Sequence, residues 1–416
     1  MNVLLFALGS HGDVHPFAGI GIRLRERGHQ VAVAANDYFK PLIEHAQLEF
    51  ISIGTVEEYK KLATNEELWN PMRGPQAVFE GTARYLRPMY EIARDFAQRP
   101  DAVIAASSLA LGARIAQDEH GIPLANVHLS PAIFQSATAP PMFLPFSLFP
   151  SWTPRAVKGG VWWMLNRMMD SVIAPTINEL RRELGLSRVR NIIRDYWHSP
   201  TLAIGLFPEW FAPMQTEWPK QTVLTGFPLF DEPDLSPIDA ELDTFLKAGE
   251  PPIAFTPGSA MWQARTFFDT CVETCVRLKR RGLLLTRHRD HLPEKLPPGV
   301  IHVHYAPFSQ LLPRCCALVH HGGIGTTAQA MAAGVPQLVT PFAHDQPDNA
   351  ERLRRLGVAG VIKASRYAPK RAVRVLEELI GSPRVAQSCK DVSARLGGVD
   401  PIGRTCELIE GLRARA

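Results

Sequence analysis

The feature that most constrains the fold is an apolar run that stops at a glycine and is followed by a helical pattern. Residues 3–8 are continuously apolar and end at Gly9, a helical pattern covers 17–27, and a second apolar run occupies 30–35. A strand buried on both faces is a continuous apolar run, and parallel strands need a long crossover between them. The chain therefore predicts a parallel βαβ unit here.

The same alternation continues in both halves of the chain. Further apolar runs that we expect to be strands lie at 102–106, 124–129, 202–206, 253–255, 283–286, 301–303, 317–320 and 337–340. Between them, residues 226–252 hold five prolines, several acidic residues and little strand signal. A chain of 416 residues also exceeds what one core usually serves.

We therefore predict an α/β fold of two Rossmann-like, doubly wound domains with a cleft between them. The expected divisions are an N-terminal acceptor-binding domain over 1–226, a linker over 227–252, a C-terminal nucleotide-sugar-binding domain over 253–390, and a helical tail over 391–416 that could cross back.

Composition excludes several classes of protein. The formal net charge is only +4, and the basic cluster at 277–281 is typical of a solvated helix face, so we expect no nucleic-acid partner. The six cysteines form no CxxC pair and have no histidine at zinc spacing, which predicts no metal site, no disulfide and a cytoplasmic location. No stretch is long enough to span a membrane, although the apolar segments 140–149 and 161–164 leave contact with its inner face open.

A glycine-rich turn after residues 317–320 has the pattern of an anion site. There an apolar run leads into HHGGIGTT and then into a helix. Glycines let the backbone approach a phosphate, and a helix N-terminus offers unpaired N–H groups and a positive dipole. The alternative is a tight turn capped by threonine. The candidate donor-binding residues here are His320, Gly322, Gly323, Gly325, Thr326 and Thr327.

Two more turns add candidates at neighbouring strand ends. The first strand of the second domain ends in TPGS, with Ser259, and a carboxylate and an amide, Asp345 and Gln346, follow a later strand. Such a pair suits the hydroxyl groups of a sugar, whereas the simpler readings are a turn and an exposed loop. Since ligands of doubly wound sheets bind at the carboxyl ends of strands, we expect a nucleotide diphosphate there.

The first strand ends in GSHGDVHP, which supplies a candidate general base. An acceptor hydroxyl that attacks a sugar carbon needs a base within hydrogen-bond reach, and Asp13 or the neighbouring His11 offers one. The alternative makes Asp13 an N-cap, with a helix starting near Pro16. His15 is a candidate acceptor contact or an ordinary loop residue.

Residues 140–169 are richer in aromatic and methionine side chains than helix packing requires. Closely spaced prolines prevent a regular element before Trp152, so the early part must be a loop, and an apolar loop is costly to expose unless it covers something. We expect a pocket for a long apolar acceptor here, or else simple completion of the core. The candidate acceptor-binding residues are Phe143, Phe146, Trp162 and Met168.

The pairing of GSHGDVHP with HHGGIGTTAQAMAAGVPQLVTPFAHDQPDNAERL resembles the nucleotide-sugar-dependent family of plant natural-product, sterol, macrolide and glycopeptide glycosyltransferases. Over nearly the whole chain the sequence is most similar to the catalytic subunits of bacterial rhamnolipid rhamnosyltransferases. The segments that carry this similarity are 68–71, 112–123, 206–213, 225–231 and 305–325.

The resemblance implies GT-B architecture, inversion at the anomeric carbon, and no metal or cofactor beyond the nucleotide sugar. It places the catalytic base on Asp13, a pyrophosphate-binding histidine on His320 and the aromatic platform for the nucleotide base on Tyr305. Its other phosphate contacts fall on Ser259, Gly322, Gly325 and Thr326, and its sugar-binding pair falls on Asp345 and Gln346.

The sequence departs from the plant members of this family at several positions. Phe308 replaces a glutamine, Ile324-Gly325 replaces Asn-Ser, and Ser107-Ser108 stands where plant enzymes orient a catalytic histidine with an aspartate. A carboxylate base needs no such partner, which fits Asp13.

We therefore expect an inverting, metal-independent glycosyltransferase that moves glucose or rhamnose from a UDP- or dTDP-sugar to a hydroxyl of an apolar lipid, sterol or polyphenol. The alternatives are a non-catalytic protein of the same fold that binds a nucleotide sugar or lipid, and a nucleotide-sugar epimerase.

Overall fold

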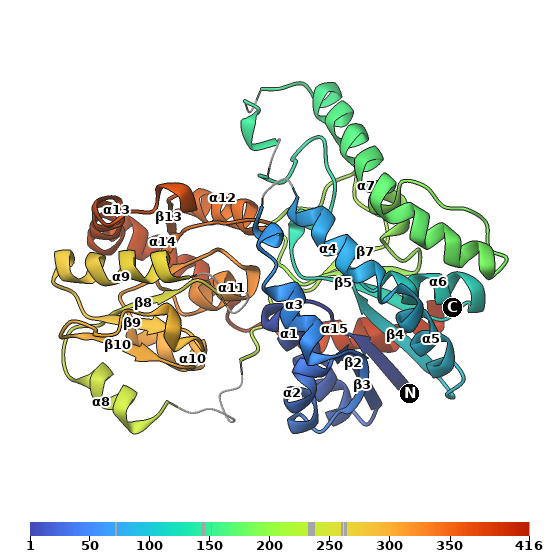
Figure 1. Cartoon of the computed structure of the whole chain (residues 1–416), viewed down its shortest axis with the longest axis horizontal. Helices are drawn as coiled ribbons and strands as arrows, with labels where there is room; N and C mark the ends of the chain where they lie inside the picture. The colour runs from blue at the N-terminus through green and yellow to red at the C-terminus, as the bar shows by residue number, and fades with distance from the viewer. Residues whose placement is uncertain are drawn as a thin grey trace. The chain divides into compact units, whose positions relative to one another are not determined.

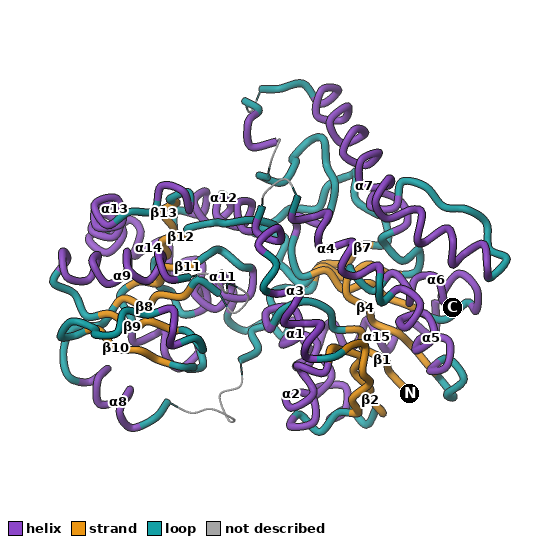
Figure 2. Tube along the Cα trace, viewed as in Figure 1, coloured by secondary structure: helices purple, strands orange, loops and turns teal. Residues whose placement is uncertain are grey.

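The computed structural model describes residues 1–70, 73–143, 146–150, 152–231, 238–258, 261 and 264–415. The chain forms two compact units, one of Met1–Pro228 with Asp400–Ala416 and the other of Leu229–Val399. In each unit a parallel sheet is covered by helices (Figure 2). The predicted fold of two Rossmann-like α/β domains is confirmed.

The first unit is built on a seven-stranded sheet of order β3-β2-β1-β4-β5-β6-β7, in which every pair is parallel. The strands are β1 (Asn2–Phe6), β2 (Gln30–Asn36), β3 (Glu49–Gly54), β4 (Ala102–Ser107), β5 (Leu124–His128), β6 (Leu202–Gly205) and β7 (Thr222–Leu224). The central strand β1 is buried along its whole length, which explains its unbroken apolar sequence. Sequence analysis missed β3, which is largely exposed or half-buried, and β7, which has only three residues.

Helices cover both faces of this sheet. They are α1 (His11–Glu26), α2 (Lys40–His45), α3 (Val56–Ala63), α4 (Gly74–Ala83), α5 (Leu86–Phe96), α6 (Leu111–His120), α7 (Arg155–Glu183) and α15 (Pro401–Glu410). The expected start of α1 near Pro16 is wrong, because the helix begins at His11. No helix in the described part of the chain is long and apolar enough to cross a membrane.

The second unit has a six-stranded parallel sheet of order β10-β9-β8-β11-β12-β13. The strands are β8 (Ile253–Thr256), β9 (Gly282–Leu285), β10 (Val300–Val303), β11 (Ala317–His320), β12 (Gln337–Val339) and β13 (Ala359–Val361). The helices are α8 (Ala240–Lys247), α9 (Arg265–Leu278), α10 (Phe308–Leu311), α11 (Ile324–Ala332), α12 (Gln346–Leu356), α13 (Pro369–Gly381) and α14 (Pro383–Leu396).

Two features differ from the expected divisions. The stretch expected as a linker, 227–252, contains α8, whose Leu242 and Leu246 pack into the core of the second unit. The tail expected from residue 391 begins inside α14, and only the residues from Asp400 onward belong to the first unit.

Helix α15 lies among the elements of the first unit, where its red ribbon meets the blue N-terminal segments (Figure 1). Cys406 and Ile409 are fully buried in the core formed by α1 and the sheet. At the surface Glu410 accepts hydrogen bonds from Arg27, at 2.8 and 2.7 Å, and lies 2.8 Å from His29. Helix α15, near the C-terminus, thus completes the hydrophobic core of the first unit.

We expect Ile409→Ala to lower the free energy of unfolding by about 2–5 kcal/mol, because it removes a fully buried aliphatic side chain and leaves a cavity. Val399→Ala is the matched control, since Val399 is 58% exposed just before α15 and should change stability by less than about 0.5 kcal/mol. Urea unfolding followed by tryptophan fluorescence measures both. Equal stability of the two variants would show that α15 is not part of this core.

Candidate functional site

In the second unit three neighbouring strands end side by side. His320, the last residue of β11, pairs with Thr256 at the end of β8 and with Val339 at the end of β12. The turns that follow these strands therefore meet at one edge of the sheet. Most of the donor-binding residues expected from the sequence lie in these turns. Ser259 lies outside the described residues.

His320 does not fit the phosphate-binding role that the resemblance implies. It is fully buried, its Nε2 lies 2.9 Å from Oε1 of Gln337, and the backbone N–H of Gly322 donates to its Nδ1 at 3.1 Å. Burial lowers the pKa of His320 to about 3, so the ring is neutral. Because both ring nitrogens already have hydrogen-bond partners, His320 stabilises the turn and has no N–H group left to donate to a phosphate.

His321 is the imidazole that faces the glycines of this edge. A Cβ at Gly258 would come within 2.5 Å of the ring, and a Cβ at Gly323 would collide with its Nε2. Burial lowers the pKa of His321 to about 4, and its Nδ1 has no hydrogen-bond partner among the described residues. Gly258 and Gly323 are therefore required at these positions, because the neutral ring of His321 packs closely against both of them.

Helix α11 begins at Ile324, after the two glycines that follow this histidine. Gly323 is its N-cap, and Gly325 in the first turn is exposed, with open space where a side chain would be. Thr326 is half-buried, whereas Thr327 is fully buried and donates its backbone N–H to Gly323 at 2.9 Å. The first-turn N–H groups of a helix have no partner within it, so this end suits an anion.

Asp345 of the expected sugar-binding pair is held by a residue that sequence analysis missed. Asn349, fully buried on α12, donates to the carbonyl oxygen of Gly322 at 2.9 Å and to Oδ2 of Asp345 at 2.8 Å. Gln346 is also buried, and its Oε1 accepts hydrogen bonds from the backbone of Phe342 at 2.8 Å and of Ala343 at 3.2 Å. Asn349 thus links the turn after β11 to the start of α12.

Tyr305 follows β10 and is half-buried. The guanidinium carbon of Arg287, which follows β9, lies 5.5 Å from the centre of its ring, within the range of a cation–π contact. Arg287 therefore packs against the expected aromatic platform.

In the first unit Asp13 closes the start of α1. Its Oδ2 accepts hydrogen bonds from the backbone N–H of Ser10 at 2.7 Å and from the Ser10 hydroxyl at 3.0 Å. A Cβ at Gly9 would collide with the same carboxylate, and Gly9 has a φ of +127°. Ser10, and not Asp13, is the N-cap, and Asp13 is the third residue of the helix in a capping box.

His11 and His15 lie together on the first turns of α1, with ring centres 5.7 Å apart. His11 also makes edge-to-face contacts with Tyr38 at 5.4 Å and Phe39 at 5.1 Å. Both histidines are half-buried and share one face of the helix, and Asp13 lies two residues from each of them in sequence.

A buried chain of polar side chains lies at the same edge of the first sheet and was not expected from the sequence. The Ser108 hydroxyl is 3.0 Å from Nδ1 of His128, and Nε2 of His128 is 3.0 Å from Nδ1 of His198. Burial holds the pKa of His128 well below its ordinary value and lowers that of His198 to about 4. Both rings are therefore neutral. The one sequence feature that pointed to this buried chain was Ser107-Ser108, which stands where plant members of the resembling family have an aspartate.

Of the expected acceptor-binding residues, the structure brings three together. Phe143, Phe146 and Trp162 form an aromatic cluster with ring centres 4.6–5.8 Å apart, and Trp162 donates from Nε1 to the carbonyl of Ser136 at 3.0 Å. Met168 is 53% exposed and His15 contacts His11 instead. Leu148, Trp152, Trp163 and Met164 are also exposed, so much of this segment covers nothing within the unit.

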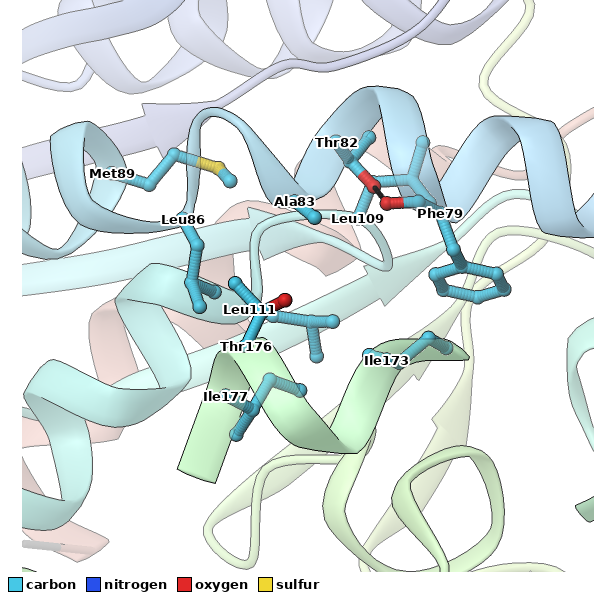
Figure 3. A pocket seen from close by; sticks show the side chains of 10 residues that line it. All are labelled: Phe79, Thr82, Ala83, Leu86, Met89, Leu109, Leu111, Ile173, Thr176 and Ile177. Atoms are coloured by element: carbon cyan, nitrogen blue, oxygen red, sulfur yellow. Dashed lines mark hydrogen bonds between the residues drawn. The ribbon is translucent and has the colours of Figure 1, made fainter. Parts of the chain in front are cut away.

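An apolar pocket lies instead between α4, α5, α6 and the later half of α7 (Figure 3). Its cavity volume is about 10 Å³, and the Thr82 hydroxyl in its wall donates to backbone carbonyls of its own helix at 3.0 and 3.1 Å. It is lined by Phe79, Thr82, Ala83, Leu86, Met89, Leu109, Leu111, Ile173, Thr176 and Ile177. A pocket of this size holds about one water, so an acyl chain would require these helices to move apart.

Two family models match the chain. Residues 3–138 match the glycosyltransferase family 28 N-terminal domain, and residues 282–397 match the C-terminal domain of erythromycin biosynthesis protein CIII-like proteins. An O-mycaminosyltylonolide 6-deoxyallosyltransferase of Streptomyces fradiae is 31% identical, with 99% of this chain and 97% of that protein covered. A sterol 3-beta-glucosyltransferase of Arabidopsis thaliana is 29% identical, with 86% of this chain and 57% of that protein covered.

The fold is also that of solved glycosyltransferases of the GT-B type. The crystal structure of glycosyltransferase VinC in complex with dTDP superposes with a TM-score of 0.68 at 18% identity, covering the whole of both chains.

Proposed function

We propose that this chain transfers a hexosyl group from a UDP- or dTDP-sugar to a hydroxyl of an apolar acceptor. The proposal starts from the family, because the chain belongs to the glycosyltransferases with a family 28 N-terminal domain and an erythromycin CIII-like C-terminal domain. The observation that carries the proposal is the turn after β11. There a helix N-terminus, open space at Gly325 and a nitrogen of His321 that has no partner among the described residues occur together, which suits a diphosphate.

The proposed reaction is a direct displacement with inversion. Asp13 takes the proton of the acceptor hydroxyl, whose oxygen forms a bond to the anomeric carbon while the bond to the diphosphate breaks. The capping box fixes one carboxylate oxygen through Ser10, so the carboxylate is oriented before the acceptor binds. His11 remains the alternative base.

On the donor side, the leaving diphosphate gains negative charge as the glycosidic bond breaks. The positive end of the α11 dipole and a hydrogen bond from His321 would stabilise that charge without a metal ion. We assign this bond to His321 instead of His320, because the ring nitrogens of His320 already have partners. Asp345 and Gln346 would bind the sugar hydroxyls, with Asn349 holding Asp345 in place.

The acceptor is proposed to be a lipid, sterol or polyphenol. The aromatic cluster of Phe143, Phe146 and Trp162 offers an apolar contact, and one relative is named for transfer to a sterol. The name of the Streptomyces relative specifies a deoxyallosyl group, which favours a 6-deoxyhexose such as rhamnose over glucose. The exposed apolar residues of α7 also support contact with the inner face of a membrane, from a cytoplasmic location.

To test the proposal, UDP-glucose and dTDP-rhamnose are each offered with 3-hydroxy fatty acids of graded length, a sterol and a flavonoid. We expect product from dTDP-rhamnose with the 3-hydroxy fatty acids. Since each buried methylene contributes about 0.8 kcal/mol, kcat/KM should rise with acyl chain length until the chain covers all of the apolar surface that it can contact. Mass spectrometry detects the product, and flotation with lipid vesicles tests the membrane contact.

A flat dependence on chain length, or a preference for free sugars, would contradict the apolar acceptor. Conversion of the donor sugar without any acceptor would indicate an epimerase. Tight donor binding without turnover of any pair would indicate a non-catalytic binding protein.

Asp13→Asn should lower turnover by about 100-fold or more while donor affinity is kept, because the amide preserves the shape but cannot accept the proton. Ser10→Ala is the matched control, since it removes the hydroxyl contact to Asp13 but leaves the carboxylate. If both variants lose activity equally, the capping box and not the base is responsible. Normal turnover of Asp13→Asn would move the base to His11 or His15.

His321→Ala should weaken binding of UDP and dTDP by about 1.5–3 kcal/mol, the value of a hydrogen bond to a charged group. His320→Ala removes the internal brace, so we expect it to lower the unfolding temperature as well as affinity. Calorimetry of nucleotide binding and thermal unfolding distinguish the two variants. Unchanged affinity in His321→Ala would return the phosphate contact to His320.

A further inference from the structure

A short turn after β9 brings two histidines onto one side of the chain. Residues Arg289–His291 form a 3-10 helix with His288 as its N-cap. Side chains three residues apart are eclipsed in a 3-10 helix, and the rings of His288 and His291 lie accordingly with centres 4.9 Å apart and planes 31° apart. Asp290 stands between them in sequence.

The backbone of this turn is fixed from within. The N–H of His288 donates to the Thr286 hydroxyl at 3.0 Å, and the N–H of His291 donates to the carbonyl of His288 at 3.2 Å. The next residue, Leu292, is 3% exposed and anchors the turn to the core. The side chains of His288, Asp290 and His291 are therefore presented together by a defined backbone.

These three side chains each offer one ligand atom, and the three atoms lie within 4.8 Å of one another. A tetrahedral ion with bonds of about 2.0–2.1 Å holds its ligand atoms about 3.3 Å apart, so small side-chain rotations close the cluster. His291 is only 9% exposed, and its Nδ1 has no hydrogen-bond partner among the described residues. A bound ion is one partner that such a buried ring nitrogen can take.

We propose that His288, Asp290 and His291 form a binding site for a divalent transition metal such as Zn²⁺. Two imidazoles and one carboxylate suit zinc, cobalt or nickel, whereas magnesium and calcium prefer oxygen ligands.

The site is separate from the proposed transfer chemistry, and no step of that reaction uses the metal. A bound ion would nevertheless affect the structure next to it, because Arg287 immediately precedes the cluster and packs on Tyr305. A bound ion would hold the turn between β9 and β10 in one conformation. The cysteine spacing predicted no metal site, whereas this cluster lies in the segment HRDH at 288–291, which contains no cysteine.

The test uses the full chain without a histidine tag, freed of metal by a chelating resin. Titration with Co²⁺ followed by visible absorption, and Zn²⁺ competition with a chromophoric chelator, measure binding. Asp290→Asn changes an exposed side chain and should fold normally. His291→Ala removes the buried ligand, and His120→Gln is the matched control, since His120 is exposed and lies 3.2 Å from Glu119.

We expect one equivalent of Co²⁺ to bind without a thiolate charge-transfer band, about tenfold or more weaker binding in Asp290→Asn and His291→Ala, and no change in His120→Gln. Zn²⁺ should also raise the unfolding temperature of the wild-type chain more than that of Asp290→Asn. Equal affinity of wild type and both cluster variants, loss of binding in the control, or displacement of Co²⁺ by millimolar Mg²⁺ would overturn the proposal.

Discussion

Parallel pairing of buried strands is the constraint on which both units depend. Strands β1 and β11 are buried along their whole length, so their backbone groups must find partners within the sheet and their side chains are mostly apolar. Most of the candidate site residues lie where the chain leaves the carboxyl edge of a sheet and turns into a helix. Asp13 at the start of α1 and His321 before α11 occupy equivalent positions in this sense, one in each unit. The tight turns require positive φ at Gly9 and Gly322.

Burial then determines what the histidines at these edges can do. The pKa values of His320 and His321 are lowered to about 3 and about 4, and that of His198 to about 4, so these rings are neutral near pH 7. A neutral imidazole can donate one hydrogen bond without the desolvation cost of a buried charge. On this account the helix dipole supplies the fixed positive potential of the donor site, and the histidine supplies a directional donor.

Sequence analysis predicted what depends on local pattern and missed what depends on distant contacts. The buried strands and the HHGG turn were evident because periodicity and glycine spacing lie within short segments. The side chains of two adjacent residues in an extended segment, however, point to opposite faces. The sequence therefore does not tell which of His320 and His321 is hydrogen-bonded by Gln337. Asn349 contacts Gly322 from 27 residues away, and His198 contacts His128 from 70 residues away. Helix α8 was missed because prolines and acidic residues around it concealed a short amphipathic pattern.

The central claim is that one displacement at the anomeric carbon transfers the sugar, with a carboxylate as base and no covalent intermediate on the protein. The anomeric configuration of the product tests it most directly. The one-bond coupling between the anomeric carbon and its hydrogen, measured by NMR on an isotopically labelled sugar, distinguishes the two configurations. The account predicts a configuration opposite to that of the sugar–diphosphate bond in the donor. A product that keeps the configuration of the donor would contradict it.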